Sequence, residues 1–288
     1  MPIARAVTKV LIKGAGEHAS GTAHRLWRAG FAVAMTEIAH PTAVRRSVAF
    51  CSAVYEGEVV VEGVRAVGYG EDLEPVCNQS SLDEALAGAG FIPVVVDLTG
   101  TLRERWRPDV IVDGRIAKRN LDCRLDDAPL VIGLGPGLEA GQDVHVAIET
   151  QRGHDLGRII SSGFASPNTG TPGVIAGVSH QRVLRAPAAG ILEARRDIGD
   201  SLEAGEIVAT VALHPVRAET SGVLRGLSHP GLEVRPGQKI GDIDPRGDRA
   251  ACWTLSDKTR TISGSVLEAI LAAGFLPCAG VRTGSSPT

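Results

Sequence analysis

The residues best suited to chemistry lie in the segment GAGEHASG, which begins at Gly14 and follows an apolar run. Gly14 would allow a tight turn, Gly16 would let a pyrophosphate approach the backbone, and Ala19 would let a helix pack close to the preceding strand. The N-terminus of that helix would offer free N–H groups to an anion. The predicted cofactor-binding residues of this turn are Gly14, Gly16, Glu17, His18 and Ala19.

Four residues further along extend this predicted site. The second apolar run ends at Glu37, about twenty residues past the turn, where the dinucleotide-binding fingerprint has an acid that binds ribose. Thr42 is suited to cap a helix carrying Arg45 and Arg46, whose guanidinium groups would bind a phosphate or carboxylate. The alternatives are that Glu37 caps the next turn and that the two arginines lie on a solvated helix face.

The elements expected to position this turn alternate between strand and helix. The tripeptide AGF ends helix-like segments at 29–31, 89–91 and 273–275, and an apolar stretch follows each of them. A glycine just past a helix, followed by an apolar residue, is typical of a left-handed helix stop. Two of these helices are predicted to begin at capping boxes, formed by Ser81 with Glu84 and Ser265 with Glu268.

The region from 121 to 251 has short apolar runs separated by Gly and Pro, which is typical of β structure. An internal repeat aligns 185–211 with 217–243. The two halves resemble the half-motifs of biotinyl and lipoyl carrier domains, so we expect a small barrel-sandwich. The segment joining them, 212–217, has no lysine, so we expect no covalent biotin or lipoyl group.

The predicted fold class is therefore α/β, with two domains. A Rossmann-like parallel sheet domain covers 1–120 and is completed by 252–288, because a lone C-terminal helix and strand cannot bury their apolar faces. A β-rich barrel-sandwich domain, biotinyl/lipoyl-like, covers 121–251. The chain has 288 residues, of which 43% are hydrophobic, and this is enough for two cores.

A second polar cluster precedes and includes the loop PNTGTPG at 167–173. Turn-forming residues of this kind can hold an anion with backbone N–H groups and hydroxyls, although a purely structural turn is the alternative. The candidates for this second anion site are Arg152, His154, Asn168, Thr169, Gly170 and Thr171.

Composition excludes several classes of protein. The net charge of −3 and the 3% aromatic content do not suit nucleic-acid or membrane binding. No apolar run reaches 18 residues and the N-terminus lacks a signal-peptide core, so a cytoplasmic location is expected. The 5 cysteines lack the short spacings of zinc sites, so no metal is expected.

Long motifs over nearly the whole chain resemble one known family. They include IKGAGEHASGTAHRLWRAGFAV, GPGLEAGQDVHVAIETQRGHDLGRI, PNTGTPG and SDKTRTISGSVLEAIL. They are similar to the YqeB-like accessory family of selenium-dependent molybdenum hydroxylases, which is related to xanthine dehydrogenase accessory and maturation proteins. The resemblance implies a molybdenum hydroxylase as partner and a role in its maturation, with the molybdenum cofactor as one candidate for what the chain handles, and it supplies no catalytic residue.

The function expected from these observations is that of an accessory protein that binds a small phosphate-bearing ligand at the Gly14 turn. NAD(P) and the molybdenum cofactor are the two candidate ligands. One alternative is an NAD(P)-dependent oxidoreductase, with His18 or Lys258 as proton donor. The other is a non-catalytic docking scaffold. Whether the chain forms a homo-oligomer stays open.

Overall fold

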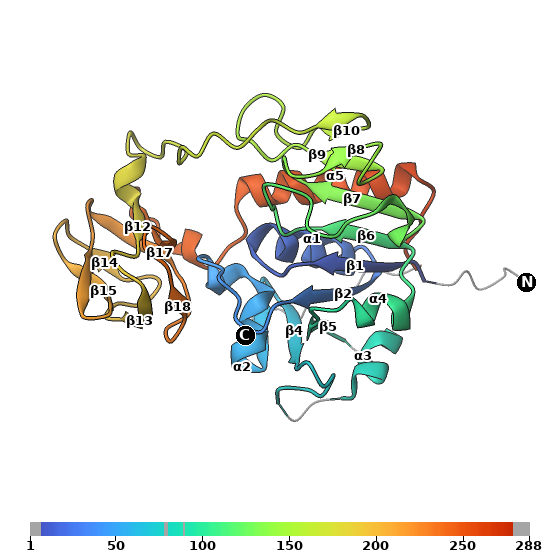
Figure 1. The fold of residues 1–288 in the computed structure, drawn as a ribbon, viewed down its shortest axis with the longest axis horizontal. Coiled ribbons are helices and arrows are strands. Elements are labelled where there is room, and N and C mark those ends of the chain that lie inside the picture. Colours follow the sequence, from blue (N-terminus) through green and yellow to red (C-terminus); the bar gives the residue numbers. More distant parts are fainter. Residues whose placement is uncertain (1–6, 78–79, 89, 279–288) are drawn as a thin grey trace, which may run out of the picture. The chain divides into compact units, whose positions relative to one another are not determined.

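The computed structural model describes residues 7–77, 80–88 and 90–278 (Figure 1). The chain forms two compact units. The first contains residues 1–39, 49–168 and 255–288, and the second contains residues 40–48 and 169–254. Among the described residues, no helix has the length and apolar character needed to cross a membrane. The cytoplasmic location stays a prediction.

The first unit is built on a nine-stranded sheet with the strand order β10-β9-β7-β6-β1-β2-β5-β4-β3. The inner strands are parallel to their neighbours, whereas the edge strands β3 and β10 are antiparallel to theirs. The strands are β1 (Lys9–Lys13), β2 (Ala32–Glu37), β3 (Glu58–Val61), β4 (Val64–Tyr69), β5 (Ile92–Val96), β6 (Val110–Asp113), β7 (Leu130–Leu134), β9 (Val146–Ile148) and β10 (Ile159–Ile160). A small ribbon pairs β8 (Glu139–Ala140) with β11 (Gly163–Phe164).

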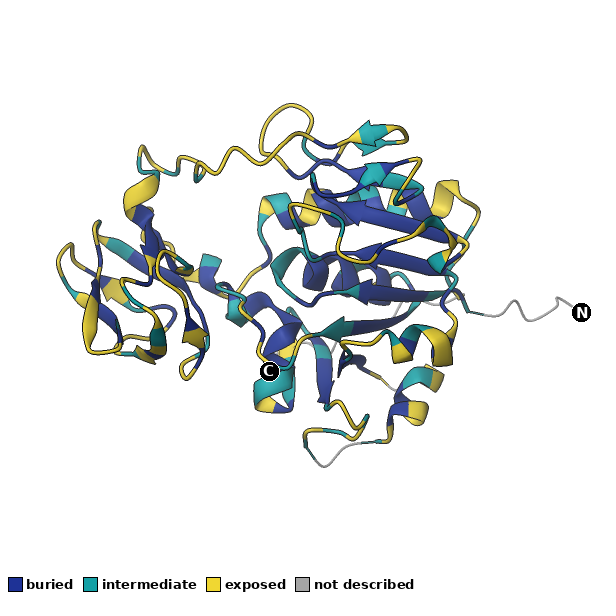
Figure 2. Cartoon of the chain, in the orientation of Figure 1, coloured by how far each residue is buried: buried dark blue, intermediate teal, exposed yellow. Residues whose placement is uncertain are grey.

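The inner strands are continuous apolar runs because both faces of the sheet are covered. Every residue of β5, β6 and β7 is buried, as Figure 2 shows in dark blue. Runs of Val, Ile and Leu without alternation are typical of such strands in parallel sheets.

Two long helices, α1 (Glu17–Arg28) and α5 (Asp257–Ala272), pack against each other. Gly21 permits this contact, because a Cβ atom there would lie 2.1 Å from the Thr259 methyl carbon. Ser256 caps α5 by accepting a hydrogen bond from Thr259 N at 3.2 Å. The predicted start of this helix at Ser265 is therefore wrong. The shorter helices are α2 (Ala53–Glu56), α3 (Leu82–Gly88) and α4 (Thr101–Trp106).

Several local predictions are confirmed. Gly30 and Gly274 have φ angles of +96° and +85°, as left-handed helix stops require. The capping box of α3 is present, because Ser81 N donates to Glu84 Oε2 at 3.1 Å and Glu84 N donates to Ser81 Oγ at 3.4 Å. The remaining AGF segment includes residue 89, which lies outside the described residues.

The predicted Rossmann-like parallel sheet is wrong. The sheet is mixed, and β5 lies between β2 and β4, so the third parallel strand along the chain does not neighbour the second. In a Rossmann sheet those two strands are adjacent. The hairpin of β3 and β4 accounts for the difference, since it occupies the edge and leaves the position beside β2 to β5.

The second unit consists of two four-stranded antiparallel sheets. One has the order β12-β19-β17-β14 and the other the order β16-β15-β13-β18. The strands are β12 (Val183–Arg185), β13 (Gly190–Ala194), β14 (Ser201–Leu202), β15 (Ile207–Val211), β16 (His214–Arg217), β17 (Gly222–Leu227), β18 (Glu233–Val234) and β19 (Lys239–Asp244). Their core includes the fully buried Leu192, Val208 and Leu224.

The predicted biotinyl/lipoyl-like barrel-sandwich is also wrong. Both sheets keep open edges, at β12 and β14 in one and at β16 and β18 in the other, so the unit is a half-barrel. The segment 40–48 from the first half of the chain also belongs to this unit. It packs closely on β17, where a Cβ atom at Gly226 would lie 2.8 Å from the Val44 carbonyl oxygen. A repeat in the sequence cannot reveal this contribution from outside the repeat.

Candidate functional site

A cavity of about 430 Å³ opens at the carboxyl edge of the nine-stranded sheet. It lies where β1, β2, β5 and β6 end. β2, which follows β1 along the chain, lies on one side of the pair β1 and β6. β7, which follows β6, lies on the other side. Open α/β sheets bind ligands at such a switch point. The charged residues that line the cavity are Lys13, Glu37, Asp97, Arg103, Arg115, Asp122, Arg124 and Asp127.

Glu37, at the end of β2, is bonded to the glycine turn itself. Its Oε2 accepts a hydrogen bond from Ala15 N at 2.6 Å, and its Oε1 accepts one from Ile38 N at 2.9 Å. Burial raises the pKa of Glu37, although these N–H groups and Arg115 act in the opposite direction. A turn N–H that would meet a ligand phosphate in a dinucleotide-binding fold is thus held by the chain's own carboxylate.

Asp97, just after β5, likewise accepts hydrogen bonds from the backbone N–H groups of a second turn. Its Oδ1 accepts hydrogen bonds from Gly100 N at 2.9 Å and Thr101 N at 3.0 Å, and its Oδ2 accepts one from Leu102 N at 2.9 Å. The first N–H groups of α4 are therefore capped from within the chain. On this side the cavity presents carboxylates fixed by backbone N–H groups.

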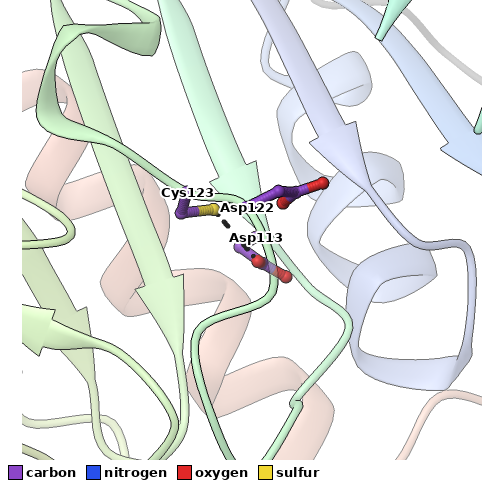
Figure 3. A group of neighbouring side chains, drawn as sticks. All are labelled: Asp113, Asp122 and Cys123. Carbon is purple, nitrogen blue, oxygen red and sulfur yellow. Dashed lines mark hydrogen bonds between the residues drawn. The ribbon is translucent and has the colours of Figure 1, made fainter. Parts of the chain in front are cut away.

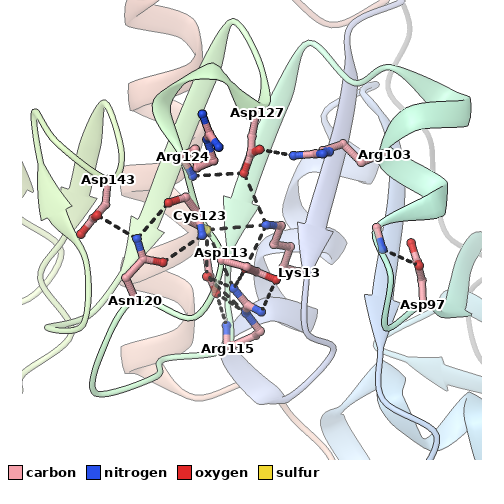
Figure 4. Close-up of polar contacts among 12 residues, drawn as sticks. Lys13, Asp97, Arg103, Asp113, Arg115, Asn120, Cys123, Arg124, Asp127 and Asp143 are labelled. Carbon is pink, nitrogen blue, oxygen red and sulfur yellow. Dashed lines mark hydrogen bonds and ion pairs between the residues drawn. The ribbon is translucent and has the colours of Figure 1, made fainter.

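The opposite side of the cavity is an ion-pair network at the ends of β1 and β6 (Figure 4). Arg115 Nη2 lies 2.6 Å from Asp113 Oδ2, and the same guanidinium contacts Asp122. Lys13 Nζ lies 3.1 Å from Asp122 Oδ1 and 3.6 Å from Asp127 Oδ2. The hydrogen bond from Arg115 lowers the pKa of Asp122, against a smaller effect of burial.

Within the described part of the chain, one group of side chains has the spacing of metal ligands. Asp113, Asp122 and Cys123 each place one ligand atom within 4.8 Å of the others (Figure 3). Burial and Asp113 raise the pKa of the Cys123 thiol to about 12, and the thiol donates to Asp113 Oδ2 at 3.1 Å. A metal would have to displace the guanidinium of Arg115 and the thiol proton, so these residues do not fit a metal site.

The predicted residues of the first turn divide between two places. Gly14 and Glu37 line the cavity. Gly16 precedes α1 in an extended conformation, and a Cβ atom there would meet nothing within 4 Å. Ala19 is buried and lies close to Gly114, just past β6, where a Cβ atom would lie 2.7 Å from its methyl group, and its predicted role against the preceding strand stays a prediction.

Glu17 and His18 do not line the cavity and contact α5 instead. His18 Nδ1 lies 2.7 Å from Thr259 Oγ1, and this hydroxyl lies 3.2 Å from Glu17 Oε1. The first turns of α1 and α5 are joined by these contacts.

Thr42, Arg45 and Arg46 belong to the second unit, and none of them lines the cavity. The helix predicted to follow Thr42 is absent there, since only a short 3₁₀ turn at Arg46–Val48 forms. Arg45 Nη2 donates to the carbonyl of Ala251 at 2.9 Å, and Arg46 Nε donates to that of Leu227 at 3.1 Å. The two guanidinium groups therefore satisfy backbone carbonyls of their own unit.

The residues of the predicted second anion site come from both units, and this site stays a prediction. Arg152 forms two hydrogen bonds of 2.8 Å with Asp257, and His154 is exposed. Asn168 is the last residue of the segment 49–168, which belongs to the first unit. The loop residues that follow it belong to the second unit. In that loop Thr171 N donates to Thr169 Oγ1 at 3.3 Å, and Gly170 has a φ angle of +69°, as a turn requires.

Most of the charged cavity residues were not predicted from the sequence. The strongest signal available was that Asp97 and Asp113 each close a buried apolar run, in VVVD and VIVD. Carboxyl ends of parallel strands meet at one edge of a sheet, so these positions pointed to that edge. The missed residues are Lys13, Asp97, Arg103, Arg115, Asp122, Arg124 and Asp127.

Comparison with solved structures gives only distant likenesses. An aspartoacylase family protein from Mesorhizobium loti is 11% identical, with a TM-score of 0.26 over 82% of this chain and 85% of that one. A succinylglutamate desuccinylase from Silicibacter is 14% identical, with a TM-score of 0.23 over 83% and 85%. The ectoine utilization protein EutE from Ruegeria pomeroyi is 12% identical, with a TM-score of 0.25 over 83% and 85%.

The predicted function is corrected by the turn itself. The Ala15 N–H, which would hold a nucleotide or the molybdenum cofactor, is bonded to Glu37. The accessory role with a nucleotide or molybdenum cofactor at the Gly14 turn is therefore wrong. TM-scores this low transfer no activity to this chain.

No protein-family model matches the chain. The uncharacterized protein YqeB of Escherichia coli (strain K12) is 47% identical over 262 residues, which are 91% of this chain and 47% of that protein. The chain thus spans about half the length of this curated relative. The sequence match supports a YqeB-like family for this chain.

Proposed function

We propose that the cavity binds a small, hydroxyl-bearing anion of the sugar-phosphate or sugar-acid class. The observation that carries this proposal is that carboxylates fixed by backbone N–H groups face a set of arginines across the carboxyl edge of the sheet. A cavity of about 430 Å³ also has the size of a site for a small metabolite.

The carboxylate side suits the hydroxyl groups of such a ligand. Glu37 accepts one hydrogen bond on each oxygen from backbone N–H groups, whereas an ionised carboxylate has about four acceptor positions. The positions that are left can accept hydroxyl donors. Because the backbone already orients Glu37, little side-chain entropy is lost when a ligand binds.

The arginine side suits the negatively charged group. Arg103 uses Nη1 to contact Asp127, and its guanidinium carries further N–H donors toward the cavity it lines. Arg124 pairs with the exposed Asp126 at 3.0 Å, a contact that solvent screens and that a ligand can replace at low cost. An arginine fork matches the oxygen geometry of a phosphate or carboxylate.

Calorimetry with ribose 5-phosphate tests this proposal, with ribose and inorganic phosphate as separate probes. We expect ribose 5-phosphate to bind more tightly than either part alone. Arg103→Gln should weaken binding about tenfold or more, because a hydrogen bond to a charged group contributes about 1.5–3 kcal/mol.

Arg65→Gln is the matched control for this variant. Its side chain is 34% exposed and lies 2.6 Å from Glu58, and that of Arg103 is 35% exposed and paired with Asp127. Equal affinities of the two variants, or binding of inorganic phosphate as tight as that of ribose 5-phosphate, would overturn the proposed ligand class.

A further inference from the structure

A second hollow, of about 830 Å³, lies beside α4 and adjoins the cavity. Arg103, Arg124 and Asp127 line both hollows, so the two meet at these side chains (Figure 4). Arg107, which directly follows α4, lines only the second hollow. A ligand that fills the cavity as far as Arg103 and Arg124 therefore has a further space beyond them.

Asp127 fixes the side chains at which the two hollows meet. Its side chain is only 2% exposed, its Oδ1 pairs with Arg103 Nη1, and its Oδ2 accepts a hydrogen bond from Arg124 N at 3.1 Å. Lys13 Nζ lies 3.6 Å from the same Oδ2. Because one nitrogen of Arg103 is held in this way, its other N–H groups keep a defined direction and stay available to a ligand.

Arg107 brings a positive charge to the second hollow that the chain itself does not neutralise. Among the residues that the structure describes, its exposed guanidinium forms no hydrogen bond or ion pair. Its backbone has a φ angle of +50° and is followed by Pro108. Left-handed residues other than glycine are unfavourable, and they are often found at ligand sites.

The carboxylates that line only the second hollow leave Arg107 free for an anion. Asp126 is paired with Arg124 at 3.0 Å, and its side chain is 72% exposed. Glu104 is exposed and forms no ion pair with a described residue. Solvent screens both of these negative charges.

Arg103 and Arg107 are placed to act together on one ligand. Arg107 N donates to Arg103 O at 2.9 Å, so the two residues lie one helical turn apart. Side chains with this spacing are neighbours on a helix, with about 5–6 Å between their Cβ atoms. Two guanidinium groups so close can bind two consecutive phosphoryl groups, each with the planar fork that suits phosphate oxygens.

We propose that the ligand is a sugar diphosphate, whose second phosphoryl group is bound by Arg107 in the second hollow. This inference rests on the proposed function, which places the hydroxyl groups at Glu37 and the first anionic group at Arg103 and Arg124. The order of these side chains, from carboxylates to arginines to Arg107, is the order of sugar, first phosphoryl group and second phosphoryl group.

Calorimetry on the full chain tests this inference, with ribose 5-diphosphate and ribose 5-phosphate as matched probes. We expect the diphosphate to bind about tenfold more tightly, since it adds hydrogen bonds to a charged group. Arg107→Gln should remove most of this advantage and leave the affinity for ribose 5-phosphate unchanged, because Arg107 does not line the cavity.

Arg105→Gln is the matched control. It removes one positive charge from α4 as well, but Arg105 lines neither hollow and pairs with Asp83 at 2.5 Å. Both affinities should stay at the parent values in this variant. An equal loss of diphosphate binding in Arg105→Gln and Arg107→Gln would reduce the effect to general charge and overturn the inference.

Two other outcomes separate this inference from the proposed function. If ribose 5-phosphate bound and the diphosphate bound no more tightly, the second phosphoryl site would be refuted and the proposed function would stand. If neither probe bound to the parent chain, the proposed function would fail and this inference with it.

Discussion

Two groups of charged residues in the first unit differ in how their cations are partnered. At the cavity, Arg115 contacts both Asp113 and Asp122, and Lys13 lies within 4 Å of Asp122 and Asp127. At the start of α5, Lys258 has three carboxylates nearby and no ion pair within the described chain. Both groups contain basic residues close to carboxylates, so their composition alone does not distinguish them.

The difference separates two uses of a charged side chain. A cation bonded by several carboxylate oxygens is held in one geometry, which suits the recognition of a ligand. Burial lowers the pKa of a lysine that has no such carboxylate bonded to it, so its charge is less favoured than in water. The comparison distinguishes cations held by carboxylates at the cavity from a half-buried lysine that has no ion pair among the described residues.

The largest expected effect follows from breaking the network at Asp113. This side chain is 3% exposed and accepts hydrogen bonds from the Arg115 backbone and guanidinium. Asp113→Ala should lower the free energy of unfolding by about 3 kcal/mol, because removing one partner of a buried pair leaves the other uncompensated. Urea denaturation measures this change.

Asp126→Ala is the control for that variant, since Asp126 and Arg124 form an exposed pair. It should leave the urea midpoint unchanged. Equal effects of the two substitutions would show that the cavity network contributes no more than a surface ion pair, and the contrast with Lys258 would then be lost.

The second effect concerns the glycine turn beside the network. Gly14 has a φ angle of +86°, and a Cβ atom there would lie 3.0 Å from Arg115 Cγ. Gly14→Ser should therefore destabilise the chain by about 1–2 kcal/mol, the cost of a left-handed conformation for an L-residue. Thermal unfolding monitored by circular dichroism gives this value.

Gly16→Ser provides a contrast within the same turn. Gly16 has a φ angle of −70° and precedes α1, where serine is a good cap. We expect no loss of stability and no change in ligand binding, since Gly16 does not line the cavity. If Gly16→Ser lost ligand binding while Gly14→Ser bound the ligand as the parent chain does, the ligand would bind at the start of α1, as predicted from the sequence, and not in the cavity.

The local structure of this turn could be predicted from the sequence because short-range sterics determine it. The run VLI before Gly14 is a strand, Gly14 has a positive φ angle, and α1 begins at Glu17. The stops at Gly30 and Gly274 follow from the same physics. The helix start predicted at Ser265 failed because Ser256, nine residues earlier, is the better placed cap.

The order of the strands and the members of the cavity network could not be read in this way. Lys13 and Asp122 are 109 residues apart in the chain, and no local pattern records that they meet. The position of β5 beside β2 likewise depends on long-range pairing and on the hairpin at the edge. Individual strands and helices follow from local periodicity, whereas the strand order, and with it the fold and the site, depends on long-range pairing.

A smaller effect concerns the pH dependence of Glu37. Burial raises its pKa in the folded chain, so the charged form is less favoured there than in the unfolded chain. Its contribution to stability should be complete below its unfolded pKa of about 4.3 and should be lost as the pH rises through the raised folded value. The stability of Glu37→Gln should therefore improve relative to the parent chain as the pH increases from acidic to neutral.

Urea unfolding of both chains between pH 4 and pH 7 checks the sign. A parent chain that gains stability over Glu37→Gln with rising pH would show that the N–H groups of Ala15 and Ile38 outweigh burial. Glu37 would then resemble the fully paired residues across the cavity.

The smallest effect is expected at Lys258, because this side chain is only half-buried and solvent screens its charge. Burial lowers its pKa, so the unfolded chain binds more protons than the folded chain between the folded pKa and about 10.4. The parent chain should gain stability as the pH rises through this window. Lys258→Gln lacks this dependence and should be slightly the more stable of the two at pH 7.

Lys118→Gln, at an exposed position, is the control variant over the same pH range. Melting temperatures recorded between pH 7 and pH 10 compare all three chains. If Lys258→Gln were the less stable chain at pH 7, the ammonium group would be held by a partner, as Lys13 and Arg115 are. The two charged groups would then be alike.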